Sequence, residues 1–178
     1  MDNSADSSHA GRLELLFLES FYGGSHRDFA DGLVRHSGHR VELRTLPPHH
    51  WKWRVRSAAL HFVREVPDPS GFDGLVVTDL ISLSDLKALW GRLCPPVLAY
   101  FHENQLTYPL PEGESMDLQF GLTDITTALA ADRVAFNSAT HRDAFLSQIP
   151  SFLRRFPDRR PHWVRSAIEE KSTVLYPG

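Results

Sequence analysis

The hydrophobic and polar positions along the chain alternate between two periods, one typical of buried strands and one typical of amphipathic helices. Residues 13–18 form a nearly continuous apolar run, as expected for a strand that is covered on both faces. Apolar residues then recur at helical spacing over 29–34 until Gly38, where a helix is expected to stop. Residues 39–46 alternate apolar and polar side chains. The pattern therefore begins with a strand, a helix and a second strand.

The same alternation continues to the end of the chain. It predicts further helices over 54–66, 84–93, 118–131, 139–148 and 161–170, and further strands over 74–78, 96–101, 133–136 and 173–176. Strands that alternate with helices form parallel sheets with right-handed crossovers. The sequence therefore predicts an α/β fold with a Rossmann-like, doubly wound parallel sheet.

The composition is that of one ordinary globular domain. The chain has 178 residues, of which 42% are hydrophobic and 23% are charged. We expect a disordered tail over 1–11 and a single folded domain over 12–178. The formal net charge of −3 argues against nucleic-acid binding over the whole surface, although a local basic patch is compatible with it.

Cysteine content and the N-terminal residues bear on the compartment. Cys94 is the single cysteine, so the chain can form no internal disulfide and no zinc site built on several cysteines. The apolar run at 13–18 is too short to span a bilayer, and the residues before it lack the basic segment of a signal peptide. We therefore expect a cytoplasmic protein that does not contact a membrane.

Ligands of doubly wound sheets bind at the carboxyl ends of the strands, and the first strand ends in a turn with two glycines. Gly23 and Gly24 can bring backbone N–H groups close to an anion or a sugar hydroxyl, and Ser25 is a candidate N-cap followed by His26. The alternative is a tight turn without a ligand. The spacing matches neither Gly-x-Gly-x-x-Gly nor a P-loop, which argues against a dinucleotide site and a nucleoside triphosphatase.

A second strand end is followed by aromatic and basic residues: Trp51, Lys52, Trp53, Arg54 and Arg56. Aromatic rings stack on bases or sugars, and cations neutralise phosphate, so this composition is typical of a nucleic-acid or glycan contact. In the alternative interpretation, the two tryptophans pack into the core and the basic residues are solvated at a helix start. The sequence leaves both interpretations open.

The strand predicted at 96–101 is followed by His102, Glu103, Asn104 and Gln105. An imidazole, a carboxylate and two amides at a ligand-binding edge can position hydroxyl groups and transfer protons. A metal pair is the weaker alternative because no His-x-x-x-His spacing accompanies these residues, and a polar surface turn is a third. We expect no metal site.

Three further groups of polar residues are candidate site residues, but their sequence patterns are less specific. Gln119 lies near the start of a predicted helix, and Asn137 and Ser138 follow a predicted strand, where Ser138 can cap the next helix. A second basic cluster covers 154–160 and is interpreted either as a solvated loop or as a substrate contact. The sequence contains no Gly-x-Ser-x-Gly motif, so it gives no support for a serine nucleophile.

Several of these motifs together resemble the N-terminal domain of the tRNA-queuosine α-mannosyltransferases, which are glycosyltransferases of the GT-B type. The resemblance extends from residue 13 to residue 176. It is carried by the motifs Glu19 to His26, Leu46-Pro47 with Trp51 to Arg54, Tyr100 to Pro109, Phe120-Gly121, Phe136 to Ser138, and Pro157 to Pro161.

The resemblance implies the N-terminal, acceptor-side half of a two-domain enzyme. Such an enzyme would transfer mannose from GDP-mannose to queuosine in tRNA with retention of configuration, without a cofactor or a bound metal. His102 would face the donor sugar, residues 23–24 would approach donor phosphate or acceptor, and residues 51–56 would meet tRNA. The cleft set implied by the combined motifs is Gly23, Gly24, Ser25, His26, Glu103, Asn104, Gln105, Tyr108, Gln119, Asn137 and Ser138.

The sequence departs from the family pattern at its end. It stops at Gly178, where the family continues into a donor-binding domain. That half supplies the cations on the diphosphate, so we expect the present chain alone to be inactive or nearly so. The alternatives are a stand-alone, non-catalytic module that binds a sugar or nucleotide, and a related glycosyltransferase with another donor or acceptor.

Overall fold

The computed structural model of the protein describes residues 11–109, 112–113 and 115–177. Apart from Gly11, the tail expected over 1–11 lies outside the described residues. None of the helices in the described ranges is both long and apolar enough to cross a bilayer.

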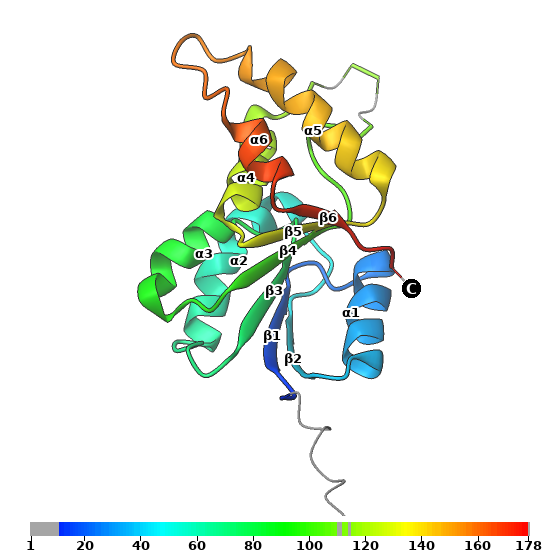
Figure 1. The fold of residues 1–178 in the computed structure, drawn as a ribbon, viewed down its shortest axis with the longest axis vertical. Coiled ribbons are helices and arrows are strands. Elements are labelled where there is room, and N and C mark those ends of the chain that lie inside the picture. The colour runs from blue at the N-terminus through cyan, green and yellow to red at the C-terminus, as the bar shows by residue number, and fades with distance from the viewer. Residues whose placement is uncertain (1–10, 110–111, 114, 178) are drawn as a thin grey trace, which may run out of the picture.

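The described part of the chain forms one parallel sheet of six strands in the order β2-β1-β3-β4-β5-β6, flanked by helices (Figure 1). The predicted α/β fold with a Rossmann-like parallel sheet is therefore confirmed. The strands are β1 (Glu14–Glu19), β2 (Arg40–Thr45), β3 (Gly74–Thr78), β4 (Val97–Phe101), β5 (Arg133–Phe136) and β6 (Ser172–Val174). The helices are α1 (Gly24–His36), α2 (Trp51–Glu65), α3 (Leu83–Trp90) with the 3₁₀ turn η1 (Gly91–Leu93), α4 (Leu118–Ala130), α5 (Ala139–Leu153) and α6 (Val164–Glu169).

The two faces of the sheet bury different sets of side chains. Phe17 of β1 and Val76 of β3 pack with Ala30 of α1 on one face. Leu16 and Leu18 of β1 point to the other face and belong to the larger core, which includes residues of α2, α3 and α4. This division follows from the period of two along a strand, and it explains why β1 reads as a continuous apolar run.

The direction of chain winding reverses at β1. This strand pairs with β2 on one side and with β3 on the other, and the later strands continue outward from β3. A crevice for ligands forms at such a switch point, outside the carboxyl ends of the strands. The loops after β1, β3 and β4 are therefore brought to one edge of the sheet.

Some predicted boundaries were wrong. α2 begins at Trp51, and not at residue 54, because His50 takes a left-handed conformation with φ 56° and its carbonyl accepts the first backbone hydrogen bonds of the helix. α5 extends through Pro150 to Leu153, beyond the predicted end at residue 148. Its last turn buries Phe152 and Leu153 in the core, and this packing outweighs the hydrogen bond that the proline removes.

The predicted N-cap of α1 was also wrong. Gly23 is the N-cap, and Ser25 lies inside the first turn of the helix. Gly24 has φ 54°, which favours glycine at this position, whereas the backbone of Gly23 is extended. A Cβ atom on Gly23 would lie 2.6 Å from Cβ of Pro48. Gly23 is therefore required for the close approach of the two loops, which the sequence alone did not indicate.

Candidate active site at the carboxyl edge of the sheet

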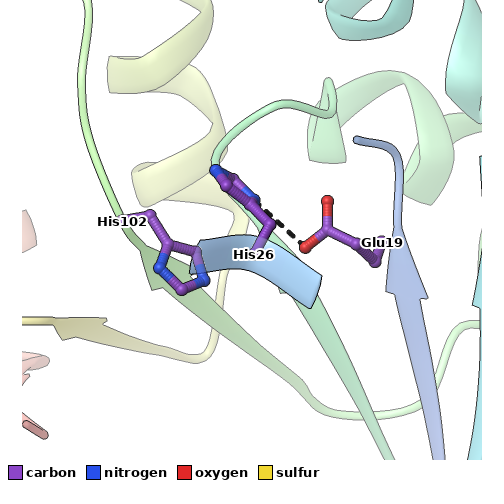
Figure 2. A group of neighbouring side chains, drawn as sticks. All are labelled: Glu19, His26 and His102. Carbon is purple, nitrogen blue, oxygen red and sulfur yellow. Dashed lines mark hydrogen bonds and ion pairs between the residues drawn. The ribbon is translucent and has the colours of Figure 1, made fainter. Parts of the chain in front are cut away.

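Three side chains from distant parts of the chain meet at this edge (Figure 2). Glu19 is the last residue of β1, His26 lies in the first turns of α1, and His102 directly follows β4. Nδ1 of His26 lies 3.2 Å from Oε2 of Glu19, and the rings of His26 and His102 have centroids 4.3 Å apart. Glu19 is completely buried and His26 is 6% exposed, so this ion pair is shielded from water.

The two histidines have opposite pKa shifts. Burial opposes the protonation of His26, but the hydrogen bond to Glu19 and the charges of Asp79, Glu19 and Glu103 raise its pKa to about 9. Burial and the positive charge of His26 lower the pKa of His102 to about 3. Near neutral pH, His26 is therefore a cation and His102 is a neutral imidazole.

Asp79 supports this arrangement from β3. It directly follows the strand, is buried, and accepts a hydrogen bond from the backbone N–H of His102 at 2.8 Å. Burial raises the pKa of Asp79 to about 7, against the opposing effect of the charge on His26. Asp79 thus holds the start of the loop after β4, and its negative charge helps to keep His26 protonated.

The loop after β4 is organised by Asn104, whose side chain is buried. Its Oδ1 accepts hydrogen bonds from the backbone N–H groups of 106–107, and its Nδ2 donates to Nε2 of His141 at 2.8 Å. Because Nε2 of His141 accepts, Nδ1 carries the proton and donates to Oδ1 of Asn137 at 2.9 Å. Nδ2 of Asn137 in turn donates to the carbonyl of His102 at 2.8 Å. The network ties the loop to β5 and α5.

A buried carboxyl group holds the same loop from another side. Asp124 of α4 accepts a hydrogen bond from the backbone N–H of Gln105 at 2.5 Å, and burial raises its pKa well above the usual value. Sequence reasoning assigned no site role to Asp79, Asp124 or His141. Asp79 follows an apolar strand directly and Asp124 interrupts an apolar helix, which are signals that were available; His141 had no comparable signal.

Three cavities open around this centre. The first has about 480 Å³, the second about 670 Å³ and the third about 420 Å³. Glu103 lines all three, and His102 lines the second and the third. The first is lined by Phe21, Gly23, Gly24, Ser25, His26, Pro48, Trp51, Leu80, Glu103, Gln105 and Tyr108.

Most of the cleft residues expected from the sequence line these cavities. Asn137 borders the second and third, and Asn104, Tyr108 and Ser138 border the third. Ser138 also caps α5 by accepting a hydrogen bond from the backbone N–H of residue 141, which confirms the predicted capping role. Gln119 lies apart from them: it is exposed in the first turn of α4 and lines none of the three cavities.

The two tryptophans of α2 have different environments. The half-buried ring of Trp51 packs on Phe120 with centroids 5.0 Å apart and also lines the first cavity. The side chain of Trp53 is 74% exposed. The structure thus separates two residues that the sequence treated alike, one packed beside the cavity and one on the surface.

The basic residues of the same helix also differ. Lys52 is exposed, and its ammonium group lies 5.6 Å from the ring centre of Trp51. Arg54 is half-buried, whereas Arg56 is exposed and donates a hydrogen bond to Thr123 at 3.4 Å. Lys52 and Arg56 are therefore the cations of this segment that remain open to a partner.

Glu19, His26 and His102 each offer a potential metal-ligand atom, and these atoms lie within 4.8 Å of one another. A tetrahedral zinc ion holds its nitrogen and oxygen ligands roughly 3.4 Å apart. Nδ1 of His26 is moreover engaged with Glu19, and its pKa of about 9 means that a metal would have to displace a proton. The geometry favours an ion pair here, and the absence of a metal stays a prediction.

Comparison with known proteins identifies the family. Residues 14–178 match a family model described as tRNA-queuosine alpha-mannosyltransferase N-terminal. The chain belongs to this family. A tRNA-queuosine alpha-mannosyltransferase of Drosophila melanogaster is 39% identical over 165 residues, which cover 91% of this chain and 44% of the fly protein. The chain therefore spans less than half the length of this relative.

Proposed function

We propose that this chain is the acceptor-side domain of a GT-B glycosyltransferase that transfers mannose from GDP-mannose to queuosine in tRNA with retention of configuration. Membership of the family supports the reaction class. The observation that carries the proposal is the meeting of three cavities at Glu103, next to His102, on the edge of the sheet where ligands of such folds bind. In this proposal the enzyme acts in the cytoplasm and requires no cofactor or metal besides the nucleotide sugar.

In this proposal, His102 faces the donor sugar. Its Nε2 atom is buried and has no hydrogen-bond partner among the described residues, and a turn of the ring toward the cavities that His102 lines would bring this atom to a sugar hydroxyl. Its neutral charge suits a hydrogen bond to a hydroxyl group and avoids repulsion of the positive charge that develops on the sugar during transfer. A donor-binding half, corresponding to the rest of the fly protein's length, would bind the nucleotide and stabilise the leaving diphosphate. This chain alone is then inactive.

The tRNA backbone would contact two basic surfaces. The first consists of the exposed side chains of Lys52, Trp53 and Arg56 on α2. The second, at the end of α5 and before α6, carries four exposed arginines and Trp163, which is 61% exposed. Cations neutralise phosphates and exposed aromatic rings stack on unpaired bases, so both surfaces have suitable chemistry.

Titration of this chain with queuosine-bearing and queuosine-free tRNA at several salt concentrations tests the acceptor. Both affinities should fall as salt rises, because phosphate contacts weaken, while the preference for queuosine persists. Equal affinity for the two tRNAs at every salt concentration would contradict queuosine as the acceptor.

The donor is tested separately on a protein that also contains the donor-binding half. Transfer from GDP-mannose to queuosine-bearing tRNA should exceed transfer from other GDP-sugars and UDP-sugars. Preferential use of another donor would identify a related transferase of different specificity, and no transfer from any donor would favour a module that only binds its ligand.

A further inference from the structure

Glu103 lies where the three cavities meet, and its carboxylate has no hydrogen-bond or ion-pair partner among the described residues. The side chain is half-buried. Burial raises the pKa of Glu103, and the nearby charge of His26 offsets only part of this increase. A carboxylate that loses water without gaining a partner is destabilised, so this position suits a ligand that brings a positive charge.

The charge around the first cavity favours a cation over a phosphate. His26 supplies one positive charge, which Glu19 already neutralises through their ion pair. The lining residues of the first cavity contain no lysine and no arginine. Asp79, which has a pKa of about 7, adds a partial negative charge close to His26. The N-terminus of α1 adds only a partial positive charge at residues 23–25, so next to the carboxylate of Glu103 an ammonium group is attracted more strongly than a diphosphate.

The walls of the same cavity suit a planar ring. Phe21, Trp51 and Tyr108 line it, together with the amide of Gln105. Its volume of about 480 Å³ is that of a typical small-ligand site. Proteins recognise unstacked RNA bases by stacking them on aromatic side chains and by hydrogen bonds to their edges. The cavity therefore combines a base-binding wall with an unpaired carboxylate.

Queuosine carries a cyclopentenediol that is joined to its base through a secondary amine, and such an amine is protonated near neutral pH. We propose, on the basis of the function proposed above, that the first cavity receives the queuosine base and that Glu103 pairs with this secondary ammonium. Glu103 is then a specificity-determining residue, since guanosine at the same position of tRNA lacks the amine. The diol lies beyond the ammonium, toward the second cavity, which His102 also lines.

Binding of queuosine-bearing and queuosine-free tRNA to the Glu103→Gln variant tests this pairing. The wild-type chain should prefer queuosine-bearing tRNA, and Glu103→Gln should reduce that preference by about tenfold while its affinity for queuosine-free tRNA stays unchanged. Glu170→Gln is the matched control, because this substitution removes the same charge. Glu170 is exposed just before β6, at the amino-terminal edge of the sheet. The control variant should keep the full preference.

A second measurement changes the ligand and leaves the protein intact. The wild-type chain should bind the queuosine nucleoside about tenfold more tightly than an analogue in which CH₂ replaces the amine. Equal binding of the two nucleosides, or a full preference for queuosine in a folded Glu103→Gln variant, would overturn the role of Glu103 alone. Absence of any preference in the wild-type chain would instead overturn queuosine as the acceptor.

Discussion

The ring of His26 lies against the ring of His102, with centroids 4.3 Å apart, but only His26 is protonated near neutral pH. Glu19 holds the charge on His26, and this charge in turn helps to keep His102 neutral. The pair thus places a cation behind a neutral imidazole. The charge of each ring can be tested on its own.

Stability should decrease as pH rises from about 6.5 to about 9. The folded-state pKa of His26 is raised from 6.5 to about 9, so its contribution is fully present below about pH 6.5 and is lost as pH rises through about 9. We expect a loss of up to about 3 kcal/mol in the free energy of unfolding. Urea unfolding of this chain at several pH values measures it.

Removal of both charges should reduce this pH dependence, while Asp79, whose pKa is raised to about 7 by burial, still titrates in this range. In the double variant Glu19→Gln with His26→Gln, neither partner is left as an unpaired buried charge, so the slope above pH 6.5 should flatten. His61→Gln, which changes an exposed histidine, should keep the slope of the wild type. A double variant with the wild-type slope would show that other groups cause the effect.

Replacement of His102 by alanine should lower turnover and leave tRNA affinity nearly intact. Because the residue is proposed to face the donor sugar, loss of its hydrogen bond should reduce kcat by about tenfold or more in a protein that includes the donor-binding half. The kinetics are measured with queuosine-bearing tRNA, and tRNA affinity is measured without donor. Unchanged turnover in a folded variant would remove His102 from the site.

The two tryptophans of α2 should respond differently to substitution. Trp53→Ala should weaken tRNA binding by about tenfold at an unchanged melting temperature, because its exposed ring contributes stacking and no packing. Trp51→Ala should destabilise the fold by about 1–3 kcal/mol, since its ring packs on Phe120. Leu60→Ala, on the exposed side of the same helix, should change neither quantity. A Trp53→Ala variant with wild-type tRNA affinity would contradict the proposed contact.

The network of Asn104 is tested by two substitutions. Asn104→Ala leaves the backbone N–H groups of 106–107 and Nε2 of His141 without partners, and should destabilise the chain by about 2–3 kcal/mol. Asn104→Asp keeps an acceptor for the loop but places a negative charge beside Nε2 of His141. The pKa of His141, which burial lowers in the wild type, should then rise. Titration of its ring signals by NMR measures this change, and an unchanged pKa would contradict the assigned hydrogen bond.

The alternation of strands and helices could be predicted from the sequence because each element is specified by its own periodicity. The strands at 74–78 and 133–136 have the predicted bounds. The strands are parallel, as predicted, because helices connect them. The short motifs around Gly23 and His102 were sufficient to indicate the family, since the family is recognised by local residue order.

What the sequence by itself determined was therefore the set of elements, the parallel sheet and the family, whereas the edge at which ligands bind stays a prediction. Only the tertiary structure decided the charges of His26 and His102, the different exposure of Trp51 and Trp53, and the joining of Asn104 to His141. The physical reason is that burial, ion pairing and hydrogen bonding depend on residues from other elements. Periodicity along the chain carries no information about which of these residues meet.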